Sequence, residues 1–166
     1  MEKPFQGFAT FLKTPIKDES RRIGIMGLPF DGATSYRPGA RFAPNAIREA
    51  SMMLTDGGHP LFRVDPCEFV TDLGDVPVSN LNVAKSLEQI EEAIHASPFY
   101  RDPNKRLLFM GGDHTVTTAI LRAIAPDHED LHVLHLDAHC DTWADHFGDP
   151  GRWPAGSQWS PCGHRP

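Results

Sequence analysis

One stretch decides the expected arrangement of this chain: Leu131-His132-Val133-Leu134-His135-Leu136-Asp137-Ala138-His139-Cys140-Asp141. It begins as a short apolar run, which predicts a strand over residues 131–136, and it ends in an Asp-x-His-x-Asp pattern. Residues two apart on an extended chain project to the same side, so Asp137, His139 and Asp141 can present two carboxylates and an imidazole to one point. Oxygen and nitrogen donors that converge at a strand end indicate half of a divalent-metal site.

The preceding segment supplies a fourth potential ligand. Residues 105–110, which are apolar from Leu107 onwards, predict a strand covered on both faces, and Gly111-Gly112-Asp113-His114 follows it. A helix predicted over 115–125 then joins this strand to the strand at 131–136, so that both strands run in the same direction. Their carboxyl ends meet at the edge where open α/β sheets place ligands, and His114 is therefore expected near Asp137.

Other polar residues nearby receive different interpretations. We expect Asp113 to orient a histidine or the loop backbone rather than to bind the ion. His132 and His135 lie inside the predicted strand and are interpreted as packing residues, and Cys140 alternates away from its neighbours and is not counted as a ligand. A single histidine at a strand end is more often a hydrogen-bonded surface residue than a ligand, but two such motifs together favour a metal.

The rest of the chain alternates between predicted strands and helices. Strands are expected at 22–27 and 69–75, a helix at 44–51, and a second helix whose cap is Ser79 or Asn80 and whose apolar positions are Leu81, Ala84, Leu87, Ile90 and Ile94. This alternation predicts a parallel sheet with helices on both faces. Residues 1–20 are expected to form an arm with one short helix, 21–150 the folded part, and 151–166 an irregular tail without Leu, Ile, Val or Phe.

Composition narrows the classes of partner. The chain has 166 residues, with 16 basic and 22 acidic side chains and a formal charge of −6, so neither nucleic acid nor an anionic membrane surface is an expected partner. Its three cysteines lack Cys-x-x-Cys spacing, and no apolar run approaches the length of a membrane span. A cytoplasmic location is the resulting prediction.

At these motifs the chain resembles the ureohydrolase family, which includes arginase and agmatinase. The matching residues are Gly111-Gly112-Asp113-His114 and 137–141, and the loop from Gly27 through Arg41 to the start of the helix at Pro44 is most similar to the agmatinase branch. The resemblance implies a three-layer α/β/α sandwich with a parallel sheet, of which this chain would hold the N-terminal half. It also implies trimers or hexamers in full-length members.

The resemblance further implies a pair of Mn²⁺ ions. By motif match, His114 and Asp141 would bind the first ion, His139 the second, and Asp137 would bridge both. Bound metals lower the pKa of a water, so that hydrolysis of a guanidino compound to urea and an amine becomes possible near neutral pH.

Substrate choice depends on Trp143, which stands where arginases present an asparagine to the α-carboxylate of the substrate. An indole ring can face an alkyl chain or a cation, which favours agmatine or guanidinobutyrate over an amino acid. Ordinary packing of Trp143 in its loop is the alternative.

Two family features are absent from the sequence. It has no later Asp-x-Asp motif, and Gly151-Arg152-Trp153-Pro154 stands where a His-Gly loop is expected, so no catalytic residue is assigned. We therefore expect an incomplete agmatinase-like chain that binds Mn²⁺ weakly and releases no urea.

Two alternative functions are retained. The chain could be a non-catalytic fragment or an interaction subunit of a longer relative. It could also be a calcineurin-like metallophosphoesterase, although its motifs occur in the reverse order and it has no Asn-His pair. Deacetylases with the same broad fold are a more distant possibility.

Overall fold

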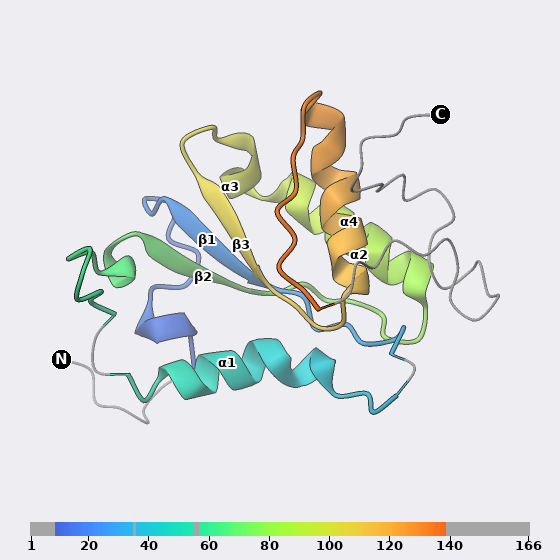
Figure 1. Ribbon diagram of the computed structural model, residues 1–166, viewed down its shortest axis with the longest axis horizontal. Coiled ribbons are helices and arrows are strands. Elements are labelled where there is room, and N and C mark those ends of the chain that lie inside the picture. Colours follow the sequence, from blue (N-terminus) through green and yellow to red (C-terminus); the bar gives the residue numbers. More distant parts are fainter. Residues whose placement is uncertain (1–8, 35, 55–56, 139–166) are drawn as a thin grey trace.

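A three-stranded parallel sheet forms the centre of the computed structural model, which describes residues 9–34, 36–54 and 57–138 (Figure 1). The strands are β1 (Ile23–Gly27), β2 (Val70–Asp75) and β3 (Arg106–Met110), in the order β2-β1-β3. Ile23 pairs with both Val70 and Arg106, so β1 is the central strand. The strands predicted at 22–27, 69–75 and 105–110 are thereby confirmed.

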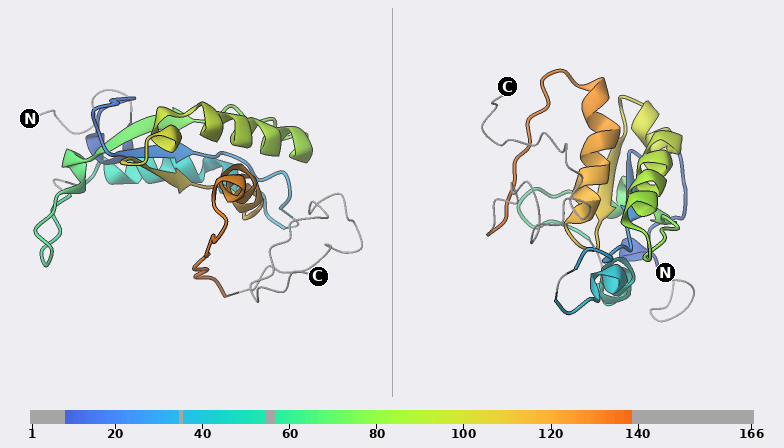
Figure 2. Two further views of the ribbon diagram at one scale, coloured as in Figure 1. Left: turned by 90° about the horizontal axis from the view of Figure 1, so that it is seen from above. Right: turned by 90° about the vertical axis from the view of Figure 1, so that its right-hand side faces the viewer.

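Helices cover both faces of this sheet. Met26 of β1 packs against α2 (Val83–Ala96) and α4 (Thr115–Ile124) in one apolar core, while the adjacent Ile25 points to the other face. That second face carries α1 (Ala43–Ser51), on the opposite side of the sheet from α2 and α4 (Figures 1 and 2). The three-layer α/β/α arrangement and the predicted helices at 44–51 and 115–125 are confirmed. The remaining elements are short: α3 (Pro98–Arg101) and the 3₁₀ turns η1 (Phe11–Lys13), η2 (Ala40–Phe42), η3 (Pro66–Glu68) and η4 (Ala125–Asp127).

A buried ion pair attaches α1 to β2. Both side chains are almost fully covered: Arg48 is 6% exposed and Asp72 is 2% exposed. The guanidinium donates to both carboxylate oxygens of Asp72, at 2.7 and 2.9 Å, and also to Asp75 at the end of β2. Asp72 accepts two further hydrogen bonds, from the backbone N–H groups of Phe11 and Gly74. Burial opposes ionisation of Asp72, but these hydrogen bonds outweigh it and hold its pKa below the ordinary value.

The predicted start of the second helix is wrong by a few residues. The side chain of Asn82, not of Ser79 or Asn80, accepts the capping hydrogen bond, from the N–H of Lys85. Asn80 instead holds the loop after β1, where it accepts from the N–H of Asp31 and donates to the carbonyl of Pro29. Leu81 consequently precedes the helix and is 99% exposed.

The predicted strand at 131–136 is also wrong, because this segment is extended but pairs with no strand within the described residues (Figure 1). A strand that is apolar on both sides is stabilised only where both faces are covered. Here Leu134 and Leu136 are more than four-fifths exposed, and Leu108 of the adjacent β3 is half exposed, so the prediction that β3 is covered on both faces fails as well. His132 and His135 are therefore not packing residues of a strand.

The ends of the chain are described only in part. Between residues 9 and 20 the chain forms η1 and an isolated parallel bridge between Ile16 and Asp72, which fits an arm with one short helix. The tail at 151–166 lies outside the described residues, and the division at residues 20 and 150 stays a prediction. Within the described residues, no helix combines the length and apolar character needed to cross a bilayer.

Candidate metal centre

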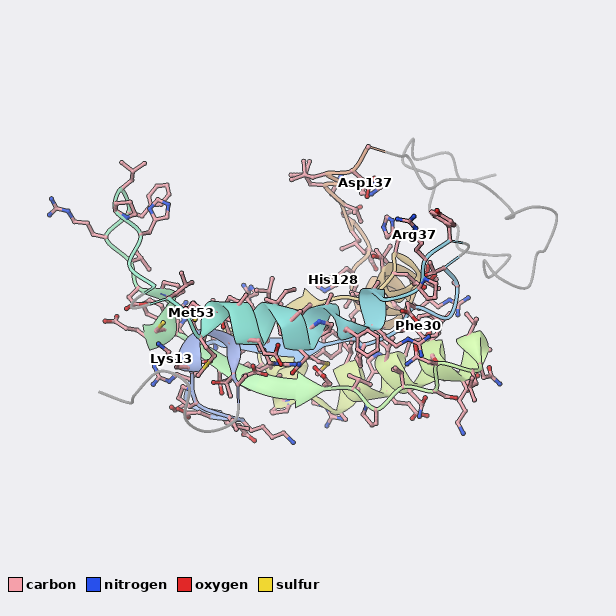
Figure 3. All side chains as sticks on the ribbon, turned by 90° about the horizontal axis from the view of Figure 1, so that it is seen from below. Lys13, Phe30, Arg37, Met53, His128 and Asp137 are labelled. Atoms are coloured by element: carbon pink, nitrogen blue, oxygen red, sulfur yellow. The ribbon has the colours of Figure 1, made fainter. Side chains whose placement is uncertain are left out.

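Three side chains with metal-binding atoms meet beyond the carboxyl ends of the strands. One ligand atom from each of His114, His135 and Asp137 lies within 4.8 Å of the other two. His114 stands between β3 and α4, while Asp137 lies on the segment that follows η4 and stands away from the body of the protein (Figure 3). His114 and Asp137 thus lie close together, as the sequence predicted, although residues 131–136 form no strand.

His135 belongs to this cluster, although the sequence interpretation set it aside. Its Nε2 atom is 3.9 Å from Oδ2 of Asp137, and its ring centroid is 5.2 Å from that of His114. The signal was available in the sequence, because the two-residue spacing that groups Asp137 with His139 and Asp141 also reaches back to His135.

Asp113 orients the backbone beside the cluster, as expected. One carboxylate oxygen accepts from the N–H of Thr115 at the start of α4, and the other accepts from the N–H of Ala33 in the loop after β1, at 2.9 and 3.1 Å. Burial raises the pKa of Asp113, and the nearby Asp31 carboxylate adds to this effect. The carboxylate of Asp113 therefore connects two loops and fixes the turn that carries His114.

The glycines of this turn allow two loops to approach closely. The N–H of Asp113 donates to the carbonyl of Phe30 at 2.7 Å, and the N–H of Leu28 donates to the carbonyl of Met110 at 2.8 Å. A Cβ atom on Gly112 would lie 1.8 Å from the carbonyl oxygen of Phe30, which no side chain can tolerate. Gly112 is therefore required for the contact between the loops.

The loop between β1 and α1 closes around a buried carboxylate. Asp31 accepts hydrogen bonds from the N–H groups of Gly39 and Arg41 and forms an ion pair with the Arg41 guanidinium. The hydrogen bond from the Arg41 side chain lowers the pKa of Asp31, against the opposing effect of burial. The described residues of this loop thus form a network of hydrogen bonds and contact the turn at 111–114 through Phe30 and Ala33.

The donor set fits a transition-metal cation. Two imidazoles and a carboxylate favour Mn²⁺, Fe²⁺, Ni²⁺ or Zn²⁺ over Mg²⁺ and Ca²⁺, which rarely accept nitrogen ligands. The two histidines are half-buried and Asp137 is exposed, so the cluster is open to solvent on one side. The other predicted site residues, His139, Asp141 and Trp143, lie outside the described residues.

Known proteins resemble both the sequence and the fold. The chain is 36% identical to the agmatinase of Bacillus cereus, over 84% of this chain and 47% of that protein, and 36% identical to the guanidinopropionase of Pseudomonas aeruginosa, over 87% and 45%. The solved structure of proclavaminate amidinohydrolase from Streptomyces clavuligerus superposes with a TM-score of 0.77 at 32% identity, over 92% of this chain and half of that one. The chain therefore spans about half the length of the curated relatives it matches.

The family model described as "Arginase family" matches residues 21–157. These matches do not favour a metallophosphoesterase or a separate interaction subunit. Because the matched residues make up most of the sequence and carry the turn with His114 and the Asp-x-His-x-Asp motif, the chain belongs to the arginase family.

Proposed function

We propose that this chain contributes to a metal-dependent ureohydrolase that converts a guanidino compound to urea and an amine. The observation that carries the proposal is the convergence of His114 and Asp137 from two separate loops in a chain of the arginase family. Guanidinium is delocalised and unreactive towards free water, so its hydrolysis requires an activated nucleophile.

The proposed metal ligands are His114, Asp137, His139 and Asp141, and the proposed cofactor is a pair of Mn²⁺ ions. Metal ions bound there would supply Lewis-acid activation of water near neutral pH. The chain's own contribution is to hold the ligands in place: Asp113 and Gly112 fix the turn that carries His114, through the backbone contacts to Ala33 and Phe30.

The proposed substrate is a guanidino compound without an amino-acid head group, such as agmatine or guanidinobutyrate. Two relatives are named agmatinase and guanidinopropionase, which supports the guanidino class. We assign the substrate contact to Trp143, whose ring can face an alkyl chain or a cation. The cytoplasmic location and the trimeric or hexameric assembly stay predictions.

A metal-binding experiment tests the proposal directly. Mn²⁺ is titrated into the full chain and the free ion is followed by electron paramagnetic resonance, for the wild type, His114→Ala and Asp137→Asn. Both substitutions should weaken binding by more than about tenfold, because even partners outside the ligand shell change metal affinity by about 10–100-fold. His128→Ala is the matched control, since His128 is an exposed histidine outside the cluster.

Substrate class is tested on the same samples. Agmatine and 4-guanidinobutyrate should perturb the bound Mn²⁺ spectrum, whereas butylamine, which lacks the guanidinium, should not. Urea release is measured in parallel, and little or none is expected because the sequence has no Asp-x-Asp motif. Mn²⁺ affinity that is unchanged in both His114→Ala and Asp137→Asn would refute the proposed site.

A further inference from the structure

The side chain of His135 is less exposed than its neighbours in the segment 131–138. Residues 131–136 form neither a helix nor a strand, and the chain bends at Asp137 and Ala138. The neighbours Leu134 and Leu136 are 85% and 87% exposed, whereas the His135 side chain is only 24% exposed. His135 is therefore the more covered side chain of this segment, and it lies close to Asp137.

The distances around His135 are close to those of a metal site. A divalent ion holds nitrogen and oxygen ligands at about 2.0–2.2 Å, so adjacent ligand atoms are about 3 Å apart and opposite ones about 4 Å. The ligand atoms of His114, His135 and Asp137 all lie within 4.8 Å of one another, with 3.9 Å between His135 Nε2 and Asp137 Oδ2. A movement of about an ångström would bring all three onto one ion.

We propose that His135 is a third metal-binding side chain, whose imidazole binds the same cation as His114 and Asp137. This inference rests on the proposed function, and it adds a ligand that the family motifs do not assign. A second imidazole beside His114 makes the site more selective for Mn²⁺, Fe²⁺, Ni²⁺ or Zn²⁺, because Mg²⁺ and Ca²⁺ rarely accept nitrogen ligands.

A competing role for His135 is to hold Asp137 without touching the metal. Its ring lies against His114, at an interplanar angle of 59°, and close to the Asp137 carboxylate, so it could position both ligands. The two roles differ in one respect: only a ligand nitrogen is directly coupled to the unpaired electrons of a bound Mn²⁺ ion.

The experiment compares His135→Phe with His135→Ala in the full chain. Phenylalanine keeps a ring against His114 but has no nitrogen donor, and alanine removes both. Both variants should weaken Mn²⁺ binding by more than about tenfold. Electron spin-echo spectra of bound Mn²⁺ should lose one directly coupled ¹⁴N nucleus in both. His132→Phe is the matched control, because His132 is exposed on the same segment and lies outside the cluster.

The outcomes separate this inference from the proposed function. If His114→Ala abolishes binding while His135→Phe retains the wild-type affinity and nitrogen coupling, the metal site stands and the role of His135 is refuted. If His135→Phe binds normally but His135→Ala does not, the ring acts only by packing, which also overturns the inference. If the wild type binds no Mn²⁺, both proposals fail. Circular dichroism and thermal unfolding establish that each variant is folded.

Discussion

The buried ion pair between Arg48 and Asp72 offers a sharp test of how α1 is held on the sheet. Replacing Arg48 by methionine keeps an apolar stem of similar length but leaves the carboxylate of Asp72 buried without its cation. The exposed fractions of 6% and 2% place this pair in the buried class, for which removal of one partner costs about 3–5 kcal/mol. The contact to Asp75 adds little to this figure, because Asp75 is 38% exposed and water can replace the guanidinium.

The same structure predicts that Asp72→Asn destabilises the wild type but stabilises Arg48→Met. In the wild type, Asp72→Asn replaces an ion pair by a hydrogen bond from the Arg48 guanidinium to a neutral amide and should destabilise the fold by about 1–3 kcal/mol. In Arg48→Met, the same substitution removes an unpaired buried charge, and the amide oxygen can still accept from the N–H of Phe11 or of Gly74. There Asp72→Asn should raise the free energy of unfolding by at least about 1 kcal/mol.

Urea denaturation of the four proteins in this cycle measures both effects at neutral pH. The free energy of unfolding is extrapolated to water, and the slope against urea concentration shows whether each variant still unfolds in one step. The reasoning would be refuted if Asp72→Asn destabilised both backgrounds equally, because the two side chains would then not interact. A loss of less than about 1 kcal/mol in Arg48→Met would contradict the buried character of the pair.

Three further predictions concern the loops, the pH dependence and a tyrosine. Gly112→Ala should destabilise the fold by several kcal/mol and weaken Mn²⁺ binding, because its Cβ would lie 1.8 Å from the Phe30 carbonyl oxygen. Gly111→Ala is the milder control, since the atom nearest to its Cβ is Val116 Cγ2 at 3.2 Å. Equal urea midpoints for the two variants would contradict the prediction. The carboxyl pKa values of Asp31 and Asp72 lie below 3.8 in the folded state. The two ionised carboxylates therefore stabilise the fold fully above about pH 5, and this contribution is lost as the pH falls through 3.8 and below. In urea midpoints measured from about pH 6 to about pH 2, Asp31→Asn should show a smaller loss than the wild type. The hydrogen bond to Asp127 raises the pKa of Tyr100 to about 12. In a titration followed by tyrosinate absorbance, one phase should therefore appear at high pH and be absent in Tyr100→Phe. A titration that is complete by about pH 11 would contradict this prediction.

Local patterns in the sequence were sufficient for most of the fold. β1 is an apolar run that ends at Gly27, β3 is apolar from Leu107 to Met110 and is followed by Gly111, and α1 starts with a proline in its first turn, so these elements are indicated by their own residues. The proximity of His114 and Asp137 was predictable from two short motifs, one that follows β3 and one that begins at Asp137.

The errors arise where structure depends on distant contacts. The sequence around Asn80 is typical of a helix cap, but its side chain forms hydrogen bonds with the backbone of Asp31 and Pro29, which lie far away along the chain. The segment at 131–136 has the composition of a buried strand, yet strand formation requires a neighbour and cover that local sequence cannot supply. His135 was expected to pack inside a strand, but without that strand its imidazole lies beside His114 and Asp137.

The order of the strands has a consequence for how the chain folds. The central strand β1 is the first of the three in the sequence, yet its partners begin at Val70 and Arg106. Parallel pairing over such separations requires closure of long loops before any ladder forms, which makes folding slow. During synthesis, β1 leaves the ribosome before β3 has been made. Its apolar residues Ile25 and Met26 are therefore exposed to solvent until their final neighbours are available. The nascent chain should therefore depend on chaperones until residue 110 has emerged.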